Sequence, residues 1–118
     1  MIKITFTEDA EILSLRVEGH AGYAEIGKDI VCSSASILAY TVAKIVNDAL
    51  AKGWLKVPPI MTIESGKTLV LCEPLPEHFL EVESAYNFAK EGFQLLSQNY
   101  SEYVKLRLDI NKNKESLT

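Results

Sequence analysis

The sequence has few of the residues that cross-link or divide small proteins. Its 118 residues include two cysteines, two histidines and four prolines. The thiols of Cys32 and Cys72 and the imidazoles of His20 and His78 are too few and too irregularly spaced for a structural zinc site. We therefore expect no metal and no cofactor. No linker or repeat interrupts the chain, which predicts one domain over residues 1–110 and a polar tail over residues 111–118.

Basic residues are also in the minority. Twelve Lys and Arg stand against sixteen Asp and Glu, for a formal net charge of −4 and an isoelectric point near 5.2. This balance argues against a protein held on nucleic acid by phosphate neutralisation, so no direct nucleic-acid partner is expected. An acidic protein can still attract a basic protein partner, because opposite net charges speed encounter.

Long apolar runs are absent too. No uninterrupted apolar stretch approaches the roughly 20 residues that span a bilayer. The N-terminal MIKITFTEDA lacks the basic segment followed by an apolar one that marks a signal peptide. We expect no membrane association and a cytoplasmic location, where both cysteines would be free thiols.

The pattern of apolar residues predicts an α+β fold. Alternation of apolar and polar residues predicts strands over residues 1–7, 12–17, 60–64, 68–72 and 103–110. Polar turns over 8–11 and 65–67 would close two hairpins. Apolar residues at helical spacing predict two amphipathic helices, from Ile30 to about Lys52 and from about Glu77 to Asn99. The order ββαββαβ favours a two-layer domain, in which both helices pack on a mostly antiparallel sheet.

The most informative stretch is residues 19–36, GHAGYAEIGKDIVCSSAS. Asp29 is a natural N-cap for the helix that follows, which places Cys32 at the third helical position. The helix N-terminus favours an anion there, so a thiolate nucleophile is favoured, and first-turn N–H groups can stabilise an oxyanion. His20, across the Gly-rich loop, could act as general base and acid.

The sequence allows two interpretations of residues 19–36 other than a catalytic pair. Cysteine is among the most buried residue types, so Cys32 and His20 can be simply a core residue and a loop residue. Residues 22–29, GYAEIGKD, also nearly match a phosphate-binding loop. The last position of that motif needs a hydroxyl, however, and Asp29 would repel phosphate. The preceding hairpin also disfavours a phosphate-binding loop.

The stretch GHAGYAEIGKDIVCSSAS resembles the signature of the ribosomal-processing cysteine protease family (Prp, or YsxB-like). That family carries a GHA-G…G-x-DIVCAA-type motif after an N-terminal hairpin. The chain length, the order of elements and the C-terminal EGFQLLSQNYSEYVKL are similar as well, so the resemblance covers almost the whole chain. The sequence departs from the family at Ser33-Ser34, where small apolar residues are common. This departure puts only the local polarity beside Cys32 in doubt.

The resemblance implies a cytoplasmic, homodimeric thiol protease without a cofactor. Such an enzyme removes the N-terminal extension of a large-subunit ribosomal protein during ribosome biogenesis, cutting between a bulky aromatic residue and a small one. Matched residue by residue, Cys32 is the nucleophile and His20 its general base. The supporting or substrate-contacting positions that the resemblance implies are Asp29, Ser36, Gly19, Gly22 and Gly27.

An alternative is a non-enzymatic ribosome-assembly protein whose Gly-rich loop holds a peptide or RNA. Outside the loop, Cys72 lies in a predicted strand among apolar residues and is expected in the core. His78 lies at a predicted helix start, where a surface position is expected. For Ser36, one helical turn after Cys32, packing or a local backbone hydrogen bond is a sufficient role.

Overall fold

The computed structural model describes residues 1–25 and 27–111. The strands are β1 (Ile2–Asp9), β2 (Ile12–Glu18), β3 (Ile60–Glu64), β4 (Lys67–Cys72) and β5 (Val104–Asn111). The helices are α1 (Ile30–Ala51), a short 3-10 turn η1 (Pro76–His78) and α2 (Phe79–Asn99). The predicted order ββαββαβ is confirmed. Residues 112–118 of the predicted polar tail lie outside the described residues.

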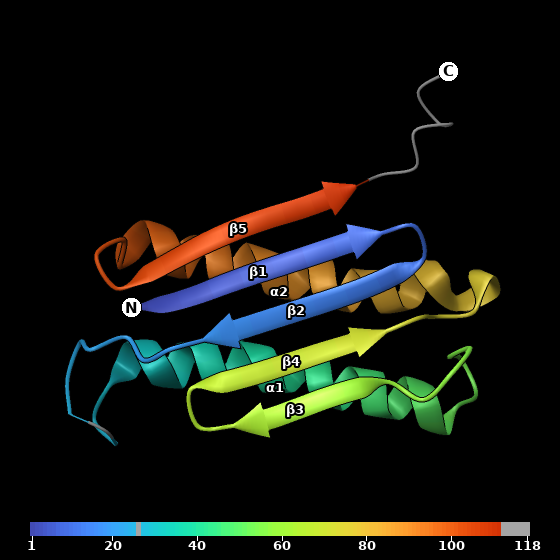
Figure 1. Cartoon of the computed structure of the whole chain (residues 1–118), viewed down its shortest axis with the longest axis horizontal. Coiled ribbons are helices and arrows are strands. Elements are labelled where there is room, and N and C mark those ends of the chain that lie inside the picture. The colour runs from blue at the N-terminus through green and yellow to red at the C-terminus, as the bar shows by residue number, and fades with distance from the viewer. Residues whose placement is uncertain (26, 112–118) are drawn as a thin grey trace.

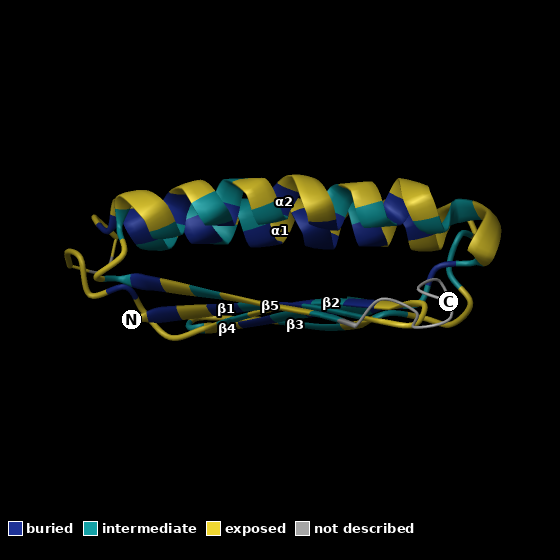
Figure 2. Cartoon of the chain, turned by 90° about the horizontal axis from the view of Figure 1, so that it is seen from above, coloured by how far each residue is buried: buried dark blue, intermediate teal, exposed yellow. Residues whose placement is uncertain are grey.

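The strands form one five-stranded sheet in the order β3-β4-β2-β1-β5 (Figure 1). The pair β1–β5 is parallel and the other pairs are antiparallel, which confirms the mostly antiparallel sheet. Both helices cover the same face of the sheet and leave the other face open (Figure 2). They run in opposite directions, so α2 ends beside the start of α1 (Figure 1).

The core lies between the helices and the sheet, where the apolar stripes of the helices face the apolar sides of the strands. Ile2, Ile4 and Phe6 of β1 alternate toward the helices and are at most 2% exposed. The ring of Phe6 meets that of Phe93 on α2 edge to face, with centroids 5.7 Å apart. Each such buried side chain contributes about 1.5–3 kcal/mol. The buried residues of α1 are small, namely Val31, Ala35, Ala39, Val42, Ala43, Val46 and Ala49.

The two helices also approach each other closely. A Cβ atom at Gly92 of α2 would lie 2.7 Å from Leu38 Cδ2 on α1, so a larger residue there would require the Leu38 side chain to shift. By length and composition α1 is apolar enough to cross a membrane. Its apolar stripe is nevertheless buried against the sheet and α2, as in the core helix of a folded domain.

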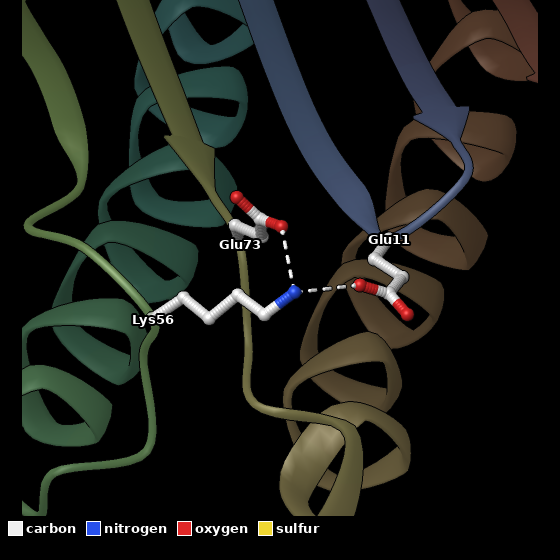
Figure 3. Close-up of polar contacts among 3 residues, drawn as sticks. All are labelled: Glu11, Lys56 and Glu73. Atoms are coloured by element: carbon white, nitrogen blue, oxygen red, sulfur yellow. Dashed lines mark hydrogen bonds and ion pairs between the residues drawn. The ribbon is translucent and has the colours of Figure 1, made fainter.

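An ion-pair cluster joins three loops at the end of the sheet opposite residues 19–29. Lys56 Nζ lies 3.1 Å from Glu11 Oε2 and 3.3 Å from Glu73 Oε2 (Figure 3). Hydrogen bonds to Glu11 and Glu73, with their charges, raise the pKa of the Lys56 ammonium. The Lys56 N–H also donates to the Glu73 carbonyl oxygen at 2.9 Å. This cluster tethers the segment that leads from α1 to β3.

The predicted turn over residues 8–11 was wrong at its first two positions. Glu8 pairs with Leu13 and Asp9 with Ile12, so the ladder continues until only Ala10 and Glu11 connect the strands. A two-residue connection needs a positive φ, and Ala10 adopts φ +56°. Lys67 similarly belongs to β4 rather than to the preceding turn. Leu50, although apolar and within α1, is 42% exposed.

We predict that Ala10→Gly stabilises the protein by about 0.5–1 kcal/mol, because glycine adopts a positive φ without the Cβ penalty. Chemical denaturation measures the free energy of unfolding. The same change inside a helix, Ala85→Gly, should destabilise by about 1 kcal/mol. A loss of stability in Ala10→Gly would show that the turn carries no strain.

Candidate active site

The loop after β2 is tied to two distant parts of the chain at its start. The Gly19 N–H donates to the Gly66 carbonyl oxygen at 2.9 Å, in the turn between β3 and β4. The amino group of Met1 donates to the His20 carbonyl oxygen at 2.6 Å. Gly19 has φ +93°, and a Cβ atom there would collide with the Met1 carbonyl oxygen. Only glycine therefore allows this close approach.

Asp29 connects the other end of the loop to α1. Its Oδ1 accepts from the N–H groups of Val31 and Cys32, both at 3.0 Å. Its Oδ2 accepts from Tyr23 at 3.0 Å and Ala24 at 3.2 Å. The carboxyl is buried, which by itself raises its pKa, but the four N–H donors outweigh burial and hold the pKa below 3.8. The predicted N-cap is confirmed, and the same carboxylate also organises the loop.

Cys32 lies at the third position of α1, in its first turn and half-buried. Its sulfur accepts a hydrogen bond from the Ala21 N–H at 3.3 Å. The neighbouring first-turn amides have other partners. Val31 and Cys32 donate to the Asp29 carboxylate, and the Ser33 N–H donates to the Asp29 carbonyl oxygen at 3.0 Å. These amides, which we expected to serve an oxyanion, are therefore engaged in capping the helix.

His20 is exposed and its ring lies against the turn between β3 and β4. A Cβ atom at Gly66 would be 2.8 Å from His20 Nε2, so glycine leaves room for the imidazole. Among the described residues, the structure has no hydrogen bond between His20 and Cys32, and Asp29 makes none to His20. Both residues instead line one cavity.

The cavity has a volume of about 740 Å³ and lies between the loop, the first half of α1 and the β3–β4 turn. All the predicted catalytic and supporting residues line it, namely Gly19, His20, Gly22, Gly27, Asp29, Cys32 and Ser36. Apolar groups from Ile2, Val17, Ile37 and Tyr40 complete its walls. The cavity is large enough for several side chains of a peptide.

The sequence did not indicate the contribution of the β3–β4 hairpin. Residues 64–68 line the cavity, although they follow Cys32 by more than thirty positions. The turn 65–67 was predictable, but its position beside His20 depends on the pairing of β4 with β2. Tyr23, Tyr100 and Tyr103 form a second unexpected group, in which the ring of Tyr23 contacts both of the others.

The remaining candidates lie away from the cavity. Cys72 is 1% exposed, which confirms its expected place in the core. Burial raises the pKa of its thiol, and the nearby Tyr86 hydroxyl only partly offsets this. His78 stacks on Trp54 with centroids 4.4 Å apart, and its Nδ1 lies 3.1 Å from Glu81 Oε1. Within residues 1–25 and 27–111, no group of three or more His, Cys, Asp or Glu is arranged to hold a metal ion.

The Asp29 carboxylate makes a pH-dependent contribution to stability. Because its folded pKa lies below 3.8, the contribution is complete above about pH 4 and is lost as the pH falls through the folded pKa. Asp29→Asn replaces one acceptor oxygen by a donor facing two N–H groups. We predict that this substitution lowers the free energy of unfolding by about 1–3 kcal/mol at pH 7. The difference in free energy of unfolding between the variant and the wild type should become smaller below pH 3.8.

Denaturation at a series of pH values measures both effects. Asp48→Asn removes an exposed carboxylate from the same helix and serves as the control, with an expected change below about 0.5 kcal/mol. Equal stability of Asp29→Asn and the wild type at pH 7 would contradict the assigned role.

Solved structures share this fold over most of their length. The Staphylococcus aureus structure described as an essential ribosomal processing protease Prp with a covalently linked product peptide matches with a TM-score of 0.70 and 22% identity, covering 92% of this chain and 100% of that one. The same protein with a substrate peptide matches with a TM-score of 0.64 and 21% identity, with the same coverage. SMU.848 from Streptococcus mutans matches with a TM-score of 0.65 and 26% identity, covering 94% and 96%.

No curated protein matches the chain at a significant level. The model of a family described as cysteine protease Prp matches residues 1–105. This match covers both strands before the loop, the cavity with Cys32 and His20, and the start of β5. The chain therefore belongs to the Prp family of cysteine proteases.

Proposed function

We propose that this protein is a cysteine endopeptidase that removes the N-terminal extension of a large-subunit ribosomal protein, with Cys32 as nucleophile and His20 as general base. The observation that carries the proposal is that one cavity, in a Prp family member, is lined by both side chains. The related S. aureus protein is described as a ribosomal processing protease and has been seen with substrate and product peptides.

In the proposed reaction, His20 takes the proton of the Cys32 thiol. The resulting thiolate adds to the scissile carbonyl carbon, and the C=O electron pair moves onto oxygen. Collapse of this intermediate breaks the C–N bond, and the leaving amine takes a proton from His20. Water then attacks the thioester and gives a proton to His20. Collapse of this second intermediate releases the carboxylate product and the Cys32 thiolate. Substrate binding brings the imidazole into reach, since catalytic hydrogen bonds often form only in the complex.

The surroundings of the site support a peptide substrate. The apolar cavity walls from Val17, Ile37 and Tyr40 suit a bulky side chain beside the cut. The formal net charge of −4 favours encounter with a basic ribosomal protein, an effect that salt screens. We also propose a cytoplasmic homodimer. Two free cysteines agree with a reducing compartment, and light scattering would measure the dimer.

We predict that the wild type cuts a peptide that spans the end of such an N-terminal extension at a single bond, between the aromatic and the small residue. Cys32→Ala should leave the same peptide uncut. Mass spectrometry of the products gives the cleavage site. Cys72→Ala is the matched control, because it removes the other, buried thiol and should leave cleavage intact wherever the protein is folded. Cleavage by Cys32→Ala would refute the mechanism, and an intact peptide with folded wild type would favour a binding protein.

We predict that Gly66→Ala lowers the rate of peptide cleavage by at least about tenfold, because the new methyl group displaces the His20 ring. A general base typically contributes a factor of about 10²–10⁴ to the reaction rate. Gly53→Ala is a matched control, since both glycines have φ +76° but nothing lies within 4 Å of a Cβ at Gly53. Both variants should lose about 1–2 kcal/mol of stability. Equal activity of the two variants would show that His20 needs no space at Gly66.

A further inference from the structure

A thiolate that attacks a peptide carbonyl needs a hydrogen-bond donor for the oxyanion it creates. In this protein the first-turn amides beside the sulfur are already used. The N–H groups of Val31 and Cys32 donate to the Asp29 carboxylate, and that of Ser33 donates to the Asp29 carbonyl oxygen. Using them for an oxyanion would uncap the helix and leave a buried carboxylate without partners. A donor from another segment would leave this cap intact.

The Ala21 N–H is directed at the reacting atom. It lies 3.3 Å from Cys32 Sγ and donates to it. The oxyanion and the sulfur are bonded to the same carbon atom, so the oxyanion forms next to the sulfur and within reach of the same donor. The Ala21 side chain is 4% exposed and packs in the core, which holds the peptide unit in place.

A cluster of three tyrosines holds the next part of the loop. The ring of Tyr23 meets the rings of Tyr100 and Tyr103 edge to face, with centroids 5.5 and 5.2 Å apart. The partners stand on a hydrogen-bonded turn. The Tyr103 N–H donates to the Tyr100 carbonyl oxygen at 2.8 Å, and the Ile2 N–H donates to the Tyr103 carbonyl oxygen at 2.8 Å. Each ring pair is worth a factor of roughly two to ten in the docking equilibrium.

We propose that the Ala21 backbone N–H is the donor that stabilises the oxyanion at Cys32, and that Tyr23, docked on Tyr100 and Tyr103, is the positioning residue that holds this donor at the sulfur. The inference rests on the proposed protease function. It assigns a role to the C-terminal motif EGFQLLSQNYSEYVKL, which supplies both partner rings although it contains neither member of the Cys/His pair.

The test measures kcat and KM for the peptide substrate, and inhibition by a peptide aldehyde of the same sequence. The sulfur adds to the aldehyde carbon, and the carbonyl electron pair moves to oxygen, which takes up the proton, so the adduct needs the same donor. We expect Tyr23→Ala to lower kcat by about tenfold or more with KM within about twofold, and to weaken aldehyde inhibition by a similar factor. Tyr23→Phe keeps the ring and should stay within about twofold of the wild type.

Two further variants make the result specific. Tyr100→Ala removes a partner ring outside the loop and should reproduce the kcat loss. Phe88→Ala removes an aromatic ring from α2 that is 77% exposed, and should change neither constant. Amide exchange gives an independent readout, because the Ala21 N–H should lose protection in Tyr23→Ala and keep it in Tyr23→Phe.

The inference is overturned if active wild type and Tyr23→Ala share the same kcat, if the loss lies in KM alone, or if Tyr23→Phe is as impaired as Tyr23→Ala. Unchanged protection of the Ala21 amide in Tyr23→Ala also overturns it. A folded wild type that cuts no peptide is a different result. That result overturns the proposed function, and with it the inference, whichever residue occupies position 23.

Discussion

The arrangement of the site depends on one buried carboxylate. Asp29 accepts four backbone hydrogen bonds, two from the loop and two from the first turn of α1. Folding the loop back therefore satisfies donors that would otherwise be left without partners near the protein interior. This geometry brings the chain from Gly19 to Ala24 beside Cys32. The carboxylate thus positions Cys32 and the loop together, and it makes no hydrogen bond to His20 among the described residues.

The cap also decides which groups remain for chemistry. In a helix whose N-terminus is uncapped, the first-turn N–H groups are free to bind an anion. Here the carboxylate uses those next to Cys32, so the remaining donor at the sulfur belongs to the loop. The loop in turn is held by the Met1 amino group, the β3–β4 turn and two tyrosine rings. Segments from both ends of the chain therefore contact this one loop.

The scaffold around this cavity is built from ordinary packing. The small residues of α1 let the helix lie close to the sheet, while α2 packs on the sheet through larger side chains such as Phe93 and Tyr86. At the opposite end, Lys56 with Glu11 and Glu73 tethers the segment that leads into β3 (Figure 3). The hairpin that carries Gly66 is therefore held at its far end as well as by the sheet.

The sequence by itself determined the elements and the helix cap, because these depend on local periodicity and on an Asp directly before a helix. It also singled out Cys32 and His20 as the candidate catalytic pair, because both lie in one contiguous motif. It missed two positions of the first hairpin, where cross-strand pairing overrode the polar character of Glu8 and Asp9. Only the tertiary structure placed Gly66 beside His20, joined Tyr23 to Tyr100 and Tyr103, and showed that Asp29 engages the first-turn amides. Those contacts depend on how two crossover connections bring distant segments together, and no local pattern of residues encodes that geometry.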